Sequence, residues 1–242
     1  EQARVTSVIL LDAHSSATIE GAHTTVERME KCLQAPETKD EIMVANTYRG
    51  CMYAYDHQID ETNIRELWEI IVKDVCENEA FAGTLYRDGM VYVGNETKTE
   101  HRPAKAEEIP QLMKMLYAFD RDFKLDPLIK SFAFHFYFVY IHPFCDGNGR
   151  IARTINSSQL YFNGFPKVKS IAIATAINRN LSGYYRSIRD CENVIDNRKK
   201  HRWLDLSPFV DYMQAIFEES MINARLADNA LSEPQRKILD RM

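Results

Sequence analysis

Two glycines and two arginines lie close together in one short stretch of the chain, residues 142–153. Gly147 and Gly149 allow backbone angles that other residues rarely adopt, so the N–H groups of a tight turn can converge there at the positive end of a following helix. Arg150 and Arg153 are three residues apart, which places both guanidinium groups on one face of that helix. Guanidinium groups are well suited to phosphate oxygens. The stretch therefore predicts a site that binds phosphate groups.

Two further side chains in this stretch suit chemistry on a bound phosphate. Asp146 offers a hard carboxylate oxygen, which fits a Mg²⁺ ion carried in by a polyphosphate better than a metal held by protein ligands alone. His142 ends the preceding helix, and histidine side chains ordinarily have a pKa of about 6.5, so its imidazole could accept a proton near neutral pH. A base beside a phosphate site is typical of a group-transfer reaction. Together these residues indicate a site for nucleotide phosphates.

Helices must position this stretch. An aromatic helix is expected at 126–141, directly before it, and apolar residues recur with the period of a helix at 64–75 and 112–119. His135 lies among phenylalanines in the aromatic helix, and we interpret it as a structural residue rather than a catalytic one. The sequence therefore predicts an all-α protein with a helical core.

Residues 83–94 break the helical pattern. An Asp-Gly pair at 88–89 separates two short runs of β-prone residues, which predicts a small β-hairpin. An isolated hairpin is marginally stable in water. We therefore expect it to pack on the neighbouring helices or to offer its edge to a strand from another chain.

The composition is that of a soluble globular protein. The 242 residues are 45% hydrophobic and 27% charged, with a formal net charge of -5, which excludes collagen-like and wholly disordered chains and disfavours general nucleic-acid binding. The longest apolar stretch, 132–141, is far shorter than the roughly 20 residues that a membrane span requires. Five scattered cysteines without a C-x-x-C pair argue against a disulfide scaffold or structural zinc. We expect a cytoplasmic protein without a membrane partner.

The stretch 142–153 resembles the signature of the Fic family, H-x-F-x-D/E-G-N-G-R-x-x-R, and it fills every specified position. The resemblance extends over about residues 40–230, and 83–94 resembles the family's flap hairpin. It implies a Fic-like helical core with that hairpin next to the active site. It also implies transfer of AMP from ATP to a Ser, Thr or Tyr hydroxyl of a protein target. Transfer of UMP, phosphate or phosphocholine, which relatives with variant motifs carry out, is the alternative within this class.

The resemblance assigns a role to each matching residue. His142 would be the catalytic base, and Asp146 would hold Mg²⁺ on the co-substrate ATP. The residues that would bind the nucleotide are Gly147, Asn148 with its side chain, Gly149, Arg150, Arg153 and the pair Tyr184 and Tyr185, for which a place in the core is the alternative. Phe144 is expected to be a packing anchor. The flap residues that would dock the protein target are Leu85, Tyr86, Arg87 and Val91.

A second motif lies near the N-terminus. Ser16, Glu20 and Gly21 match the family's inhibitory pattern S/T-x-x-x-E-G/N, and the first two share one helix face. The resemblance implies that Glu20 pairs with Arg153 and blocks the γ-phosphate position, so that transfer to a target or to the protein itself is slow. It leaves open whether the same carboxylate also positions water for removal of AMP.

These motifs divide the chain into three expected parts. Residues 1–38 form an N-terminal segment with the inhibitory helix, and 39–230 form the Fic core. Residues 231–242 resemble the first helix of the winged-helix domain that follows many bacterial Fic domains, and the chain does not begin with Met, so we expect a piece of a longer protein. Nucleic acid would bind only through such a further domain. A nucleotide-sensing module of a DNA-binding regulator is therefore the alternative to an enzyme.

Overall fold

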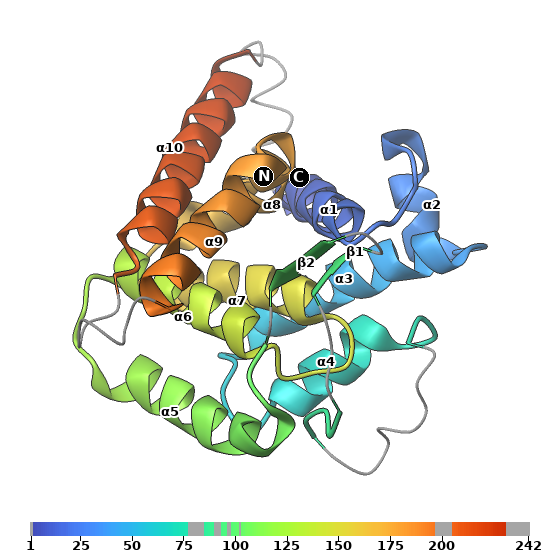
Figure 1. Cartoon of the computed structure of the whole chain (residues 1–242). Helices are drawn as coiled ribbons and strands as arrows, with labels where there is room; N and C mark the ends of the chain where they lie inside the picture. The colour runs from blue at the N-terminus through green and yellow to red at the C-terminus, as the bar shows by residue number, and fades with distance from the viewer. Residues whose placement is uncertain are drawn as a thin grey trace.

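The computed structural model describes residues 2–76, 85–89, 93–95, 98–101, 103–196 and 205–230. These residues are mainly helical, as predicted (Figure 1). The helices are α1 (Gln2–Ile19), α2 (Met29–Gln34), α3 (Lys39–Asp56), α4 (Ile64–Val72), α5 (Ile109–Asp122), α6 (Pro127–Ile141), α7 (Asn148–Phe162), α8 (Ile173–Arg179), α9 (Leu181–Asp196) and α10 (Ser207–Ala230). Short 3₁₀ turns lie at Val26–Arg28, Ala106–Glu108 and Pro166–Ser170.

Helix α6 lies at the centre of the core. Phe132 and Phe136 belong to one buried apolar cluster, whereas Phe134 and Phe138 belong to a second. A helix that is apolar on every side must be covered on every side. The neighbouring α7 packs along α6 (Figure 1), so the central helix fixes the place where the 142–153 stretch begins and ends.

His135 lies inside this central helix and makes one hydrogen bond across the core. Its Nε2 lies 2.9 Å from the hydroxyl oxygen of Tyr184 on α9, and both side chains are buried. Burial lowers the pKa of His135 to about 3, so the ring is neutral near neutral pH. The structural interpretation of His135 is confirmed. The same contact corrects the prediction for Tyr184, which belongs to the core rather than to a nucleotide pocket.

Helix α1 is part of the same core as α6 and α9. Ile9 and Ile19 belong to the cluster that contains Phe132. On the polar side, the backbone N–H of Thr175 at the start of α8 donates to the Asp12 carboxylate at 3.1 Å. The N-terminal helix is therefore held by apolar contacts and by a polar contact to α8.

A β-hairpin is present, but it begins later than predicted. Strand β1 (Val93–Asn95) pairs antiparallel with β2 (Lys98–His101), so the described strand pairing lies at 93–101 and not on either side of 88–89. Residues 85–89 form bends and not a strand, because their backbone is held on the loop that follows α6. Val91 lies outside the described residues, so its predicted docking role is neither supported nor contradicted.

Three further predictions concern the chain as a whole. Within the described part, no helix has both the length and the apolar character needed to cross a bilayer. The five cysteines are free thiols in this structure. Residues 231–242, the predicted start of a winged helix, lie outside the described residues.

Candidate active site

The loop between α6 and α7 is shaped by two residues with left-handed backbone angles. His142 ends α6 with φ 53° and ψ 62°, and its N–H donates to the carbonyl oxygen of Phe138 at 3.0 Å. Gly147 precedes α7 with φ 82°, a conformation that side chains disfavour. A Cβ atom there would also lie 3.0 Å from the Val72 side chain. Gly147 therefore allows the chain to turn sharply into α7 while packing against α4.

Phe144 and Asn148 brace the inside of the loop. Phe144 is buried, and its ring stacks on Trp68 with 5.5 Å between centroids, which confirms its predicted role as a packing anchor. The Asn148 side chain accepts from the Phe144 N–H at 2.9 Å and donates to its carbonyl oxygen at 2.8 Å. The sequence predicts a phosphate contact for this side chain, whereas its amide is buried and committed to the loop backbone.

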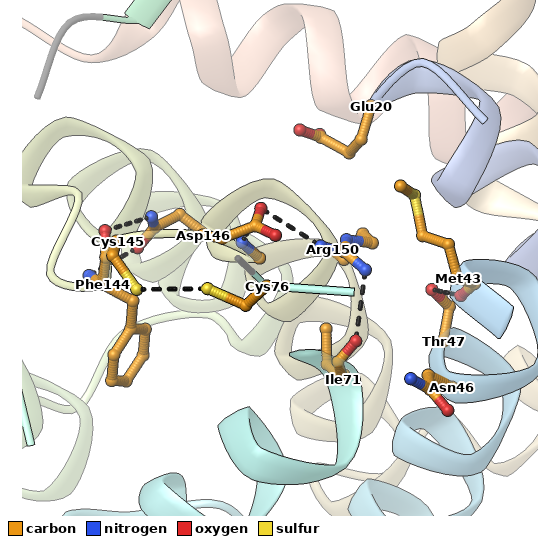
Figure 2. A network of polar contacts seen from close by, with 12 residues as sticks. Glu20, Met43, Asn46, Thr47, Ile71, Cys76, Phe144, Cys145, Asp146 and Arg150 are labelled. Atoms are coloured by element: carbon orange, nitrogen blue, oxygen red, sulfur yellow. Dashed lines mark hydrogen bonds and ion pairs between the residues drawn. The ribbon is translucent and has the colours of Figure 1, made fainter. Parts of the chain in front are cut away.

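Arg150 joins the loop to α4. Its side chain is 1% exposed; Nη1 donates to the carbonyl oxygen of Ile71 and Nη2 to the Asp146 carboxylate, both at 3.2 Å (Figure 2). The sequence predicts a phosphate contact for Arg150, but its guanidinium is buried and holds α4 in place. Asp146 is 43% exposed, and its Oδ1 also accepts from the Gly147 N–H at 2.6 Å. Both bonds fall on one carboxylate oxygen of Asp146, which leaves Oδ2 for a cation.

Arg153 joins the same helix to α1 instead. Its Nε donates to the Ser16 hydroxyl at 2.8 Å, and its Nη2 donates to the Ser16 carbonyl oxygen at 3.0 Å. Nη2 also lies 2.6 Å from Oε1 of Glu20, which is the predicted ion pair. Burial lowers the pKa of Arg153, but the charge and hydrogen bond of Glu20, together with Tyr184 and Tyr185, outweigh it and leave the pKa above its ordinary value. Tyr185 is partly buried near this guanidinium.

The Glu20 carboxylate lies directly against Gly149 in the first turn of α7. A Cβ atom at position 149 would collide with Oε1 of Glu20, so only glycine permits this approach. Figure 2 shows the side chain extending toward the loop that carries Asp146 and Arg150. Burial raises the pKa of Glu20, but the charges of Arg153, Arg150 and His142 outweigh it and hold the pKa below its ordinary value.

An ionised carboxylate therefore occupies the start of α7. The first N–H groups of any α-helix lack partners within the helix, and the helix dipole favours an anion there. The carboxylate that lies against the first turn of α7, where the sequence predicts an anion site, thus belongs to the chain itself.

Arg87 ties the base of the hairpin region to the same loop. It is 3% exposed, and its guanidinium donates to the carbonyl oxygens of His142 at 2.7 Å, Ala104 at 2.6 Å and Gly89 at 2.6 Å. Its backbone N–H donates to the carbonyl oxygen of Pro143 at 3.0 Å. The prediction that Arg87 docks a protein target is wrong, because the side chain is buried and fully engaged with the main chain.

Leu85 and Tyr86 differ from this buried arginine. Both are partly buried, and the Tyr86 ring packs near Phe144, with 5.8 Å between centroids. They also line an open groove beside the start of α5. Their role in docking a target stays a prediction.

Comparison with known proteins agrees with this geometry. Residues 58–160, which include α6, the loop and most of α7, match the profile of the Fic/DOC family. The chain therefore contains a Fic domain within these residues.

Curated relatives of this Fic chain carry the name of one activity. A protein of Aquifex aeolicus named probable protein adenylyltransferase is 26% identical over 208 residues, which cover 82% of this chain and 61% of the relative. A protein adenylyltransferase of Caenorhabditis elegans is 22% identical over 186 residues, or 76% of this chain and 35% of the relative. The chain thus spans less than two thirds of the length of each of these relatives.

Solved structures agree with the fold of this Fic chain. A Fic family protein from Desulfovibrio desulfuricans G20 superposes with a TM-score of 0.80 at 22% identity, covering 96% of this chain and 69% of that one. Fic-1 from Caenorhabditis elegans gives a TM-score of 0.71 at 20% identity, covering 92% and 64%. At these identities the likeness establishes the helical Fic fold.

The sequence alone missed three residues around this Fic site. Trp68 was expected only as part of a buried stripe, yet its Nε1 donates to the carbonyl oxygen of Asp146 at 3.2 Å. A buried indole N–H usually needs a partner, which is a signal that could have found it. The second is Asp12 on α1, and burial raises its pKa to about 7. The third is Cys76, whose Sγ lies 3.7 Å from that of Cys145. The local sequence contains no signal for either residue.

Proposed function

We propose that this Fic chain is a protein adenylyltransferase, which moves AMP from ATP to a Ser, Thr or Tyr hydroxyl of a protein target or of itself. The observation that carries the proposal is the Glu20 carboxylate on Gly149 and Arg153, because it marks a position built for an anion. The names of the relatives support AMP as the transferred group.

Three parts of the site would hold the triphosphate. The N–H groups at the start of α7 would bind phosphate oxygens, and Arg153 would pair with the outermost phosphate once Glu20 has left it. The Asp146 carboxylate fits Mg²⁺, because it is half-exposed and one of its oxygens accepts no bond from the loop. Bound there, the metal would neutralise charge on the phosphates. Arg150 would act through Asp146 and α4 rather than on the nucleotide.

His142 is the proposed catalytic base. The target hydroxyl oxygen would attack the α phosphorus of ATP, its proton would pass to the imidazole, and the bond to the β phosphate would break to release pyrophosphate. The end of α6 and the guanidinium of Arg87 hold the backbone of His142 on both sides. We therefore assign Arg87 as a positioning residue for this base.

Glu20 is the proposed inhibitor of the reaction. Its carboxylate and a phosphate group cannot both pair with Arg153 and lie on Gly149, so the nucleotide must displace it or bind out of line. Misplacement of reacting atoms by about 1 Å can lower a rate by roughly 10²-fold. The resting protein is therefore expected to transfer AMP slowly.

The experiment is a mass measurement on the intact protein after incubation with ATP and Mg²⁺. We expect little change for the wild type and a gain of one AMP for Glu20→Gly. The gain should vanish in Glu20→Gly/His142→Ala and persist in the matched control Glu20→Gly/His23→Ala, which removes an exposed histidine outside the site.

Parallel incubations with UTP test the alternative donor. AMP transfer that does not depend on His142, or faster transfer from UTP than from ATP, would contradict the proposal. Nucleotide binding without transfer in every variant would favour the nucleotide-sensing module instead.

A further inference from the structure

Two cysteines that are far apart in sequence meet beside the proposed active site. The Sγ atoms of Cys76 and Cys145 lie 3.7 Å apart, although 69 residues separate them along the chain (Figure 2). Both side chains are partly buried and not sealed in the core. Cys145 directly precedes Asp146 in the loop, and Cys76 follows the end of α4. The pair therefore connects the loop to α4 at the position of the proposed metal ligand.

The distance between the two Sγ atoms is short enough for the thiols to form a disulfide. A disulfide needs its sulfur atoms at about 2.05 Å, and a pair already in contact can reach this by side-chain rotation with a small backbone movement. Neither cysteine lies within a helix, so both can adjust. We propose that Cys76 and Cys145 are a site of reversible disulfide formation that links the active-site loop to α4.

The reaction needs a two-electron oxidant, for which hydrogen peroxide serves. In the first step the sulfur of Cys76 bonds to one oxygen of the peroxide, the O–O bond breaks, and the thiol proton leaves with the other oxygen as water, which gives a sulfenic acid on Cys76. The sulfur of Cys145 then attacks that of Cys76, the S–O bond breaks, and a second water leaves with the Cys145 proton. Two thiols lose two electrons, and one peroxide gains them.

The consequence for the site depends on the proposed function. The loop is already tied to α4 by the hydrogen bonds of Arg150 to Ile71 and of Trp68 to Asp146. A disulfide would draw Cys145, and with it the adjacent Asp146, further toward α4. Because metal and phosphate binding depend on the position of that carboxylate, the oxidised protein should bind Mg²⁺-ATP more weakly than the reduced protein.

The first experiment maps the disulfide directly and does not depend on activity. Trypsin releases Cys76 in peptide 74–87 and Cys145 in peptide 131–150, each with a single cysteine. After oxidation by peroxide or glutathione buffers, we expect these two peptides cross-linked and separated again by dithiothreitol. Cys76→Ser should abolish the cross-link, whereas Cys191→Ala, which changes a buried cysteine elsewhere, should leave it intact. Absence of the cross-link, or separate glutathione adducts on the two cysteines, would overturn the proposal.

The second experiment measures the consequence by titrating Glu20→Gly protein with Mg²⁺-ATP in a calorimeter. We expect oxidation to weaken binding by about tenfold, given the sensitivity of such sites to small displacements. Dithiothreitol should reverse the loss, and Glu20→Gly/Cys76→Ser should not show it. If the cross-linked and reduced proteins bind Mg²⁺-ATP with equal affinity, the disulfide does not affect the site and this part of the proposal is wrong. Failure of AMP transfer in the reduced protein would instead contradict the proposed function and leave the disulfide unaffected.

Discussion

Helices α1 and α4 approach the start of α7 from different directions, and each holds one arginine of that helix. On the α4 side, Arg150 donates to the main-chain carbonyl oxygen of Ile71 and is 1% exposed. On the α1 side, Arg153 pairs with Glu20, whose side chain is 33% exposed. The carbonyl oxygen of Ile71 cannot move away from Arg150 unless the backbone of α4 moves. The Glu20 carboxylate can move away from Arg153 by rotation of its side chain alone.

This difference indicates which contacts are fixed and which are exchangeable. The α4 side acts as a frame, because Arg150 and Gly147 contact the end of that helix and Trp68 within it donates to the loop. The α1 side offers an anion that a phosphate group can replace. Variants on the two sides should therefore differ in kind: those on the α4 side should lower stability, and those on the α1 side should raise activity.

The largest effect is expected for Arg150→Ala. The change leaves the buried Ile71 carbonyl without its partner and opens a cavity, which should lower the free energy of unfolding by about 3 kcal/mol. Urea denaturation would measure it. The matched control is Arg65→Ala, which breaks an exposed pair with Glu69 and should cost less than about 1 kcal/mol. Equal losses in the two variants would contradict the role of Arg150 as a frame.

Removal of the Glu20 side chain should act on the rate instead. A charge-assisted hydrogen bond is worth about 1.5–3 kcal/mol, so Glu20→Gly should raise the initial rate of AMP transfer roughly 10- to 100-fold. Glu20→Gln, which loses the charge but keeps an acceptor, should give a smaller increase. Exposed Glu61→Gln serves as the control. If Glu20→Gly and Glu61→Gln behave alike, α1 does not restrain the site.

Ser16→Ala should show a weaker effect of the same kind. It removes the 2.8 Å bond from Nε of Arg153, but the bond to the Ser16 carbonyl oxygen and the pair with Glu20 remain. A neutral hydrogen bond contributes about 0.5–1.5 kcal/mol, so we expect a rise of roughly 2- to 10-fold in the same rate assay. If the rate of AMP transfer rises more in Ser16→Ala than in Glu20→Gly, Ser16 rather than Glu20 is the main residue that restrains Arg153.

The last prediction concerns pH and the contact between α1 and α8. Burial raises the pKa of Asp12 to about 7, well above the roughly 3.9 of an unfolded chain, so the folded state binds the proton more tightly. The stabilisation that protonated Asp12 contributes to the folded state is therefore present at low pH and is lost as the pH rises from about 4 to about 7. Asp12→Asn should remove this decline.

The measurement compares unfolding free energies at pH 5 and pH 8. The wild type should lose stability relative to Asp12→Asn between these values. Exposed Asp190→Asn should follow the wild type. Parallel profiles for Asp12→Asn and the wild type would show that the carboxylate is not desolvated.

The sequence predicted the turn at Gly147 and the pair between Glu20 and Arg153 well, and the hairpin region poorly. The loop depends on glycine backbone angles and on the spacing of neighbouring residues, which are local properties that the sequence states directly. The positions of Arg87 and residues 85–89 depend instead on carbonyl groups of the loop more than fifty residues away. No local pattern distinguishes an arginine that will be buried against carbonyl oxygens from one that will face a partner.

The sequence by itself determined the helical core, the turn at Gly147 and the pairing of Glu20 with Arg153, because periodicity, glycine angles and motif spacing act over a few residues or match a known family pattern. Only the tertiary structure decided that Arg150 and Asn148 brace the loop, that Tyr184 belongs to the core and that Cys76 meets Cys145. Each of these depends on which distant backbone or side chain comes within about 4 Å once the helices have packed, and that distance is a property of the assembled core.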